Sequence, residues 1–196
     1  MDEHTLAAYD NASAAFARDW REQPEPSDLY ALLGEYFAPG PTVDIGCGAG
    51  RDVAWLAAHG YDASGYDASA GLLQQAEASY PGLRFGRAAL PELAGVPVGA
   101  YQNVLCETVV MHLDPRDVGA STRSLLGLLR PSGTLFLSWR VSEGSTRDAH
   151  GRLYAAFDKR QVLDALAGAT ILLDREDVNL SSGKKVHRLV ARKAGA

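Results

Sequence analysis

The sequence has few cysteines, no cluster of histidines and no excess of basic residues, and each of these absences excludes a class of protein. Its 196 residues include two cysteines, Cys47 and Cys106, too few for a disulfide framework. None of the five histidines stands at metal-ligand spacing from a cysteine or another histidine, so we expect no metal site. The net charge of −5 argues against a nucleic-acid partner, because nucleic-acid-binding domains usually carry a basic surplus.

The sequence also lacks a long apolar run. No segment approaches the length that spans a membrane, and the N-terminal residues lack the basic and apolar parts of a signal peptide. We therefore expect a cytoplasmic protein without a membrane partner, present as a monomer or homodimer. The length allows one α/β domain over residues 1–196 and is too short for two ordinary domains.

A strand-like run that turns into glycines is the most informative stretch of the chain. The β-branched run 42–45 is followed by glycines at 46, 48 and 50 and then by a helix-like pattern. In parallel α/β sheets this arrangement opens a ligand crevice at the carboxyl edge, and the helix N-terminus favours an anionic group such as a carboxylate. A dinucleotide-binding fingerprint would place a small residue three positions after Gly48, where this chain has Arg51.

The remaining pattern predicts a helical segment over 1–39 and an α/β core over 40–193. Helices are expected over 5–20, from residue 27 and over 68–79, 114–129 and 158–167. Strands are expected over 63–66, 83–87, 100–106 and 135–139, followed by a terminal hairpin of 170–178 and 185–192. The aromatic residues Tyr9, Phe16 and Trp20 share one face of the first helix. They either pack among themselves, or this segment folds over a ligand with Tyr9 pointing into the site.

A single aspartate at the end of the second expected strand supports a nucleotide site. Asp67 would lie beside the glycine loop, where a carboxylate can accept two hydrogen bonds from ribose hydroxyls. Alternatively, it is a turn residue or a cap of the helix that starts near Ser69. Together with the glycine loop, we favour the ribose role.

Three motifs together resemble those of class I S-adenosylmethionine-dependent methyltransferases, in particular the small-molecule type 11 and 12 domains. They are the acidic residue before alternating glycines, the stretch 107–113 after the fourth strand, and Leu-Arg-Pro-Ser-Gly-Thr before the fifth. The resemblance implies a Rossmann-like, doubly wound α/β fold with a seven-stranded sheet, mostly parallel with an antiparallel last strand, plus N-terminal helices. At the turn where the family often contacts adenine through an acidic side chain, this chain has Ala89, which leaves backbone or apolar contacts.

The resemblance implies S-adenosyl-L-methionine as cofactor. The carbonyl groups of Gly46 and Cys106 would face its amino group, and Arg51 would pair either with Asp52 or with its carboxylate. The full set of expected cofactor residues is Tyr9, Asp44, Gly46, Cys47, Gly48, Gly50, Arg51, Asp67, Ala68, Ala89, Leu90, Cys106 and Glu107.

Methyl transfer from a sulfonium is an in-line displacement that depends mainly on positioning and needs no obligatory base or metal. His112 is the first candidate base and Glu107 the second, although a histidine in this turn is equally compatible with a structural role. The expected substrate-binding residues are Trp20, His112, Trp139 and Arg140, with the polar loop 140–157 as a further wall.

The sequence after the fourth strand also limits the acceptor. It reads Cys-Glu-Thr-Val and lacks the Asn/Asp-Pro-Pro-Tyr/Phe signature of enzymes that methylate amino groups of bases or glutamine. We therefore expect a small-molecule substrate with an oxygen, sulfur, ring-nitrogen or metalloid acceptor. Two alternatives are an NAD-dependent oxidoreductase and a non-catalytic module that binds S-adenosylmethionine.

Overall fold

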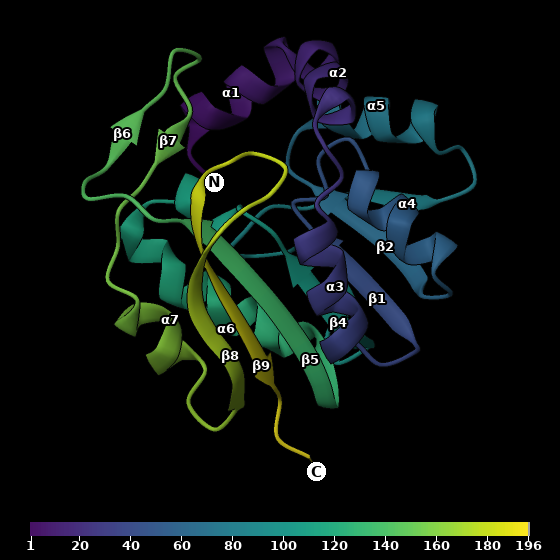
Figure 1. Cartoon of the computed structure of the whole chain (residues 1–196), viewed down its shortest axis with the longest axis vertical. Coiled ribbons are helices and arrows are strands. Elements are labelled where there is room, and N and C mark those ends of the chain that lie inside the picture. The colour runs from purple at the N-terminus through teal and green to yellow at the C-terminus, as the bar shows by residue number, and fades with distance from the viewer. Residues whose placement is uncertain (196) are drawn as a thin grey trace.

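A seven-stranded sheet with helices on both faces forms the centre of the molecule (Figure 1). The computed structural model describes residues 1–195. The strands are β1 (Pro41–Ile45), β2 (Asp62–Asp67), β3 (Arg84–Arg87), β4 (Tyr101–Cys106), β5 (Leu129–Arg140), β8 (Thr170–Val178) and β9 (Lys185–Arg192). The helices are α1 (Glu3–Asn11), α2 (Ser13–Glu22), α3 (Ser27–Tyr36), α4 (Arg51–Ala58), α5 (Ala70–Ser79), α6 (Val118–Leu128) and α7 (Arg160–Ala165).

The order of the strands places a crevice at one edge of the sheet. The order is β3-β2-β1-β4-β5-β9-β8, parallel except for β9, which pairs antiparallel with both of its neighbours. The chain builds outward from β1 in one direction and then from β4 in the other. A ligand crevice is expected where these directions diverge, beyond the carboxyl ends of β1 and β4. The predicted Rossmann-like sheet with its antiparallel last strand is confirmed.

Apolar side chains of the central strands point alternately to the two faces of the sheet and contribute to a hydrophobic core on each face. In β5, Leu135 and Leu137 pack with α6 and α7 on one face, whereas Phe136 packs with α3 and α4 on the other. Successive side chains of a strand point to opposite faces, and each fully buried apolar side chain stabilises the fold by about 1.5–3 kcal/mol. The sheet is therefore a rigid platform for its carboxyl edge. No helix within residues 1–195 has the length and apolar character needed to cross a membrane.

Residues 3–22 form two helices, α1 and α2, rather than the single helix expected over 5–20. The backbone leaves the helical region at Ala12, with φ −124° and ψ 22°, and α2 starts at the next residue. At the end of α1, Asp10 Oδ1 accepts hydrogen bonds from Ser69 Oγ at 2.6 Å and from Gly71 N at 3.0 Å. A carboxylate is favourable at the N-terminus of α5, and this one attaches the N-terminal helices to the edge that holds the crevice (Figure 1).

The expected polar loop over 140–157 contains a small sheet of its own. β6 (Thr146–Arg147) pairs antiparallel with β7 (Leu153–Tyr154). Arg147 forms an ion pair with Asp2 at 2.8 Å, which joins this hairpin to the N-terminal helices. The 3-10 helices η1 (Val110–His112) and η2 (Pro115–Asp117) precede α6, so the expected helix from residue 114 begins as 3-10.

Candidate active site

Two adjoining cavities lie at the carboxyl edge of β1 and β4. The smaller one is bordered by Asp67 and Ala68 at the end of β2 and by α1. The larger one is bordered by the glycine loop, α2, the β6–β7 hairpin and the loop that joins β8 to β9. Five residues border both cavities: Tyr9, Gly46, Glu107, Thr108 and His112. These five form the wall at which the two cavities meet.

The glycine loop has a backbone that only glycine adopts without strain. Gly46, Gly48 and Gly50 have φ values of +80°, +54° and +84°, in the left-handed region. A Cβ built on Gly46 would overlap Cγ2 of Val109. The loop after β4 therefore packs directly on the backbone of the glycine loop, and the surface left beside it is lined by main-chain groups.

Asp67 ties the glycine loop to the start of α5. Its Oδ2 accepts a hydrogen bond from Gly48 N at 2.9 Å, and its Oδ1 accepts one from Ser69 N at 2.8 Å. Burial raises the pKa of the carboxyl group, and the N–H donors of Ser69 and Gly48 oppose that rise. The cap of α5 is Ser69, whose Oγ accepts from Leu72 N, so Asp67 remains available to the smaller cavity.

Glu107 is a half-buried residue that follows β4 and contacts β5. It accepts hydrogen bonds from Ser138 Oγ and, at 3.3 Å, from Asn179 Nδ2. Burial is the main cause that raises the pKa of Glu107 to about 7. A carboxyl group with this pKa binds a cation only after it has released its proton, so its charge responds to pH near neutrality.

His112 is held as a neutral imidazole with one nitrogen free to accept. Nδ1 hydrogen-bonds to the Leu153 carbonyl oxygen, and because a carbonyl only accepts, Nδ1 carries the proton. Nε2 is then an acceptor, and the Tyr9 hydroxyl donates to it at 3.1 Å. Burial, with smaller contributions from Arg152 and Arg140, lowers the pKa of His112 to about 4.

Tyr9 is fixed from two sides. Its hydroxyl oxygen accepts a hydrogen bond from Arg152 Nη1 at 3.3 Å, and Arg152 is itself bound to Asp148. The Tyr9 ring packs edge-on against Phe16, with centroids 5.2 Å apart. Burial raises the pKa of Tyr9 to about 12, so the phenol stays protonated at neutral pH and serves as the donor to His112.

Arg51 pairs within its own helix. Its Nε donates to Asp52 Oδ1 at 2.8 Å, and the Tyr30 hydroxyl donates to the same oxygen at 2.9 Å. We expected Arg51 to pair with either Asp52 or the cofactor carboxylate, and the structure contains the pair with Asp52. Asp44 is buried in β1, where burial and the nearby carboxylates of Asp52 and Asp67 raise its pKa.

The structure brings most of the predicted site residues together. Those that border a cavity are Tyr9, Trp20, Gly46, Cys47, Gly48, Arg51, Asp67, Ala68, Glu107, His112 and Arg140. Those that border neither of the two are Asp44, Gly50, Ala89, Leu90, Cys106 and Trp139. Trp139 instead borders a separate hollow and stacks on His187 of β9, with ring centroids 4.5 Å apart. Arg140, the next residue of β5, borders the larger cavity and also this hollow, whereas Trp139 borders the hollow alone.

Several residues that border the larger cavity are not predicted from the sequence. Thr108 has φ +55° although it is not a glycine, and its N–H donates to Ser138 Oγ. Asn179, Ser181 and Ser182 reach the cavity from the loop between β8 and β9. In the sequence that loop is an ordinary turn, and only the return of β9 to the side of β5 places it here.

Comparison with known families identifies the core. Residues 42–133 match a family model described as a methyltransferase domain, and this segment holds the glycine loop, Asp67, Glu107 and His112. This segment of the chain is similar to a methyltransferase domain. No curated protein sequence is significantly similar to the whole chain.

Solved structures share the fold of this chain at low sequence identity. An S-adenosylmethionine-dependent methyltransferase from Methanosarcina mazei is 19% identical, with a TM-score of 0.72, 86% of this chain covered and 99% of the other. The 1,6-didemethyltoxoflavin-N1-methyltransferase of Burkholderia thailandensis is 21% identical, with a TM-score of 0.72 and 97% and 88% covered. An S-adenosylmethionine-dependent methyltransferase from Mesorhizobium loti is 21% identical, with a TM-score of 0.70 and 85% and 96% covered.

Proposed function

We propose that this methyltransferase transfers the methyl group of S-adenosylmethionine to a small-molecule acceptor in the cytoplasm. The observation that carries the proposal is the wall shared by the two cavities, where Tyr9, Glu107 and His112 border both. A donor on one side and an acceptor on the other would meet there. Holding the two reactants in line contributes about 7–11 kcal/mol to lowering the barrier.

The residues around the smaller cavity and the glycine loop fit the cofactor. Asp67 is buried beside Gly48 and would accept hydrogen bonds from the ribose hydroxyls. Gly46 borders both cavities, and its carbonyl group would face the cationic amino group. Glu107, which borders both cavities with Gly46, would supply a carboxylate for that same cation. The bound cofactor supplies an activated methyl group and leaves as a neutral thioether.

The larger cavity would hold the acceptor, with His112 as its base. Nε2 of His112 is unprotonated and accepts a hydrogen bond from the Tyr9 hydroxyl. When the acceptor displaces that hydroxyl, its own O–H or N–H can donate to Nε2 as the methyl bond forms. Trp20 and Arg140 border the same cavity, and residues 1–39 act as a cap over it. The 1,6-didemethyltoxoflavin-N1-methyltransferase, whose structure contains 1,6-didemethyltoxoflavin and S-adenosylhomocysteine, supports a small-molecule acceptor.

Calorimetric titration with S-adenosylmethionine, S-adenosylhomocysteine and NAD tests the proposal. We expect the first two to bind and NAD not to bind. Binding of NAD alone would favour the oxidoreductase alternative and contradict the proposal. Formation of S-adenosylhomocysteine during incubation with a panel of small acceptors then distinguishes an enzyme from a module that only binds the cofactor.

A further inference from the structure

The larger cavity is cationic although the protein is acidic. Its lining contains four arginines, Arg21, Arg51, Arg140 and Arg152, and two carboxyl groups, those of Asp52 and Glu107. The chain as a whole has a net charge of −5. His112 does not add to the cavity's charge, because its lowered pKa keeps it neutral. Positive charge is therefore concentrated at the place where the acceptor would bind.

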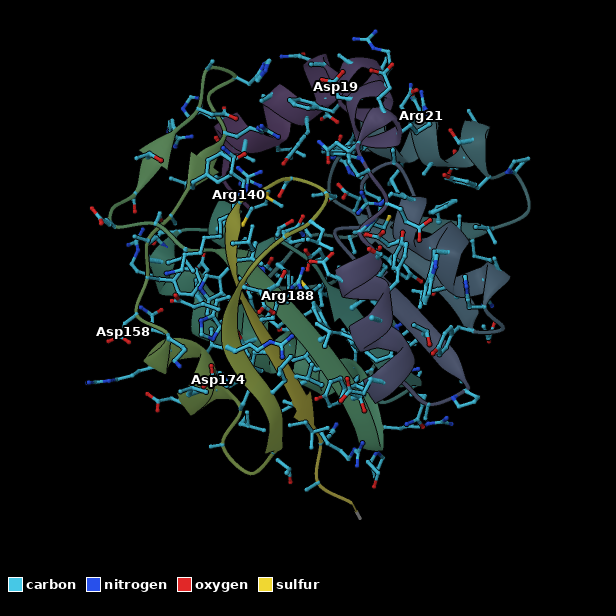
Figure 2. All side chains as sticks on the ribbon, in the orientation of Figure 1. Asp19, Arg21, Arg140, Asp158, Asp174 and Arg188 are labelled. Carbon is cyan, nitrogen blue, oxygen red and sulfur yellow. The ribbon has the colours of Figure 1, made fainter. Side chains whose placement is uncertain are left out.

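Two of these four arginines are neutralised and two are not. Arg51 is bound to Asp52 at 2.8 Å, and Arg152 to Asp148 at 2.6 Å. Within residues 1–195, neither Arg21 nor Arg140 has a carboxylate within 4.0 Å. Figure 2 labels both, Arg21 on α2 and Arg140 at the end of β5. Arg21 is exposed, whereas Arg140 is half-buried, so Arg140 loses more hydration and gains more from an anionic partner.

Arg140 lies on the acceptor side of the crevice. The glycine loop follows β1, and β5 is two strands away from β1, a separation of about 10 Å. The carboxylate of a cofactor held at the glycine loop is therefore served by the N-terminus of α4, close to β1, and not by Arg140. The backbone N–H of Arg140 contacts Sδ of Met111 at 3.5 Å, which places this residue beside η1 and His112.

One aromatic ring joins Arg140 to the candidate base. Cζ of Arg140 lies 4.8 Å from the centroid of the Tyr154 ring, and the rings of Tyr154 and His112 are 5.1 Å apart. The guanidinium group of Arg140 and the imidazole of His112 thus both pack against the Tyr154 ring. Tyr9 and Trp20 add two more aromatic rings to the lining of the same cavity. Such walls favour a planar molecule, since aromatic faces pack on one another and on guanidinium groups.

From this juxtaposition we infer that the acceptor is a planar aromatic acid. Its anionic group pairs with Arg140, and its nucleophilic hydroxyl or ring N–H faces Nε2 of His112. The inference rests on the proposed function, because the sulfonium of the donor adds a further positive charge beside the cavity. An anionic acceptor is attracted by both charges, whereas a cationic one is repelled by both. On methyl transfer, the acceptor forms a bond to carbon, the carbon–sulfur bond breaks, and the proton of the acceptor passes to His112.

Matched pairs of aromatic acids and amides test this inference on the protein saturated with S-adenosylhomocysteine. Salicylate with salicylamide, and indole-3-carboxylate with its amide, share a ring and a nucleophile and differ in charge. We expect calorimetry to show that at least one acid binds about tenfold tighter than its amide, or more. Arg140→Gln should abolish that preference and Arg140→Lys should keep part of it. Arg123→Gln, an exposed arginine of α6, is the matched control and should keep all of it.

Each other result overturns the inference in a recognisable way. Equal binding of acid and amide, no binding of either, or a preference that survives Arg140→Gln would contradict an anionic acceptor at Arg140. If Arg140→Gln instead weakens S-adenosylhomocysteine binding tenfold, Arg140 serves the cofactor. Failure of the wild-type protein to bind S-adenosylhomocysteine at all would contradict the proposed function itself, so the two failures are distinguishable. Thermal unfolding of each variant checks that it folds.

Discussion

The hydroxyl oxygen of Tyr9 lies 3.1 Å from Nε2 of His112, although 103 positions separate the two residues. Because Nδ1 of His112 donates to the Leu153 carbonyl, the tautomer is fixed and Tyr9 must be the donor. The first helix of the chain therefore supplies a group that holds the candidate base neutral and oriented. The N-terminal helices thus contribute a hydrogen bond to the candidate site.

Replacing Tyr9 by phenylalanine should raise the pKa of His112. The hydrogen bond from the phenol stabilises the neutral imidazole by about 1 kcal/mol, which corresponds to a change of about 0.7 in pKa. The Tyr9→Phe variant removes this bond and keeps the ring that packs against Phe16. Titration of the imidazole signals by NMR measures the change. Tyr36→Phe, on α3 away from both cavities, should leave the signals of His112 unchanged.

The lowered pKa of His112 should make the fold less stable in mild acid. Between the ordinary value of 6.5 and about 4, the unfolded chain binds a proton that the folded chain excludes. The free energy of unfolding therefore falls as pH falls through this range, by about 3 kcal/mol from this residue. Urea unfolding of the wild type and of His112→Asn at pH 7 and pH 5 measures the effect.

The comparison of these two proteins removes the contribution of Glu107, which has the opposite sign. The raised pKa of that carboxyl group lowers stability as pH rises from 4.5 to about 7, and it does so in both proteins. His112→Asn should be less stable than the wild type at pH 7 and should lose less on acidification. Parallel losses in the two proteins would show that His112 is not the group that titrates.

Binding of the cofactor should strengthen as pH rises toward and just above 7. Glu107 has a pKa of about 7 and must be ionised to pair with the cationic amino group. Below that pH, deprotonation opposes binding by about 1.4 kcal/mol for each pH unit. Calorimetry at pH 6, 7 and 8 should show the largest gain between pH 6 and 7. Glu107→Gln should bind more weakly at pH 8 and lose the pH dependence; an unchanged profile would place the amino group elsewhere.

The sequence was sufficient to predict the fold, and most of the residues expected to bind the cofactor border one of the two cavities. Gly46, Gly48 and Asp67 belong to local patterns whose geometry follows from a strand that ends and a helix that begins. The acceptor half depends on contacts between distant segments, which no local pattern encodes. The sequence therefore does not show that the loop of Asn179 reaches the cavity. It also does not show which way Trp139 points, since that depends on the register of β5 against β9.

Adding a methyl group at Gly46 should destabilise the fold far more than adding one at Gly60. Both residues have φ near +80°, at +80° and +86°, so both substitutions strain the backbone by about 1–2 kcal/mol. A Cβ at Gly60 meets nothing within 4 Å, whereas one at Gly46 overlaps Val109. We expect Gly46→Ala to cost about 2–3 kcal/mol more than Gly60→Ala. Thermal unfolding measures both; equal losses would mean that the loop after β4 moves away without cost.

Two Tyr-Asp pairs at opposite ends of β2 provide a matched test of ribose binding. Asp67 is buried beside Gly48 at the carboxyl end, whereas Asp62 is exposed at the other end and pairs with Arg84. Loss of charge-assisted hydrogen bonds should make Asp67→Ala weaken S-adenosylmethionine binding by about 1.5–3 kcal/mol, and Asp62→Ala should leave it unchanged.

Part of the effect of Asp67→Ala would arise from the glycine loop itself, because the substitution leaves Gly48 N without its acceptor. Asp67→Asn removes the negative charge and keeps one acceptor for Gly48 N, while its amide nitrogen can no longer accept from Ser69 N. We expect Asp67→Asn to unfold below the wild-type temperature but above that of Asp67→Ala, and to bind S-adenosylmethionine at least tenfold more weakly than the wild type. Full affinity in Asp67→Asn would show that the carboxylate supports the loop and does not bind the ribose.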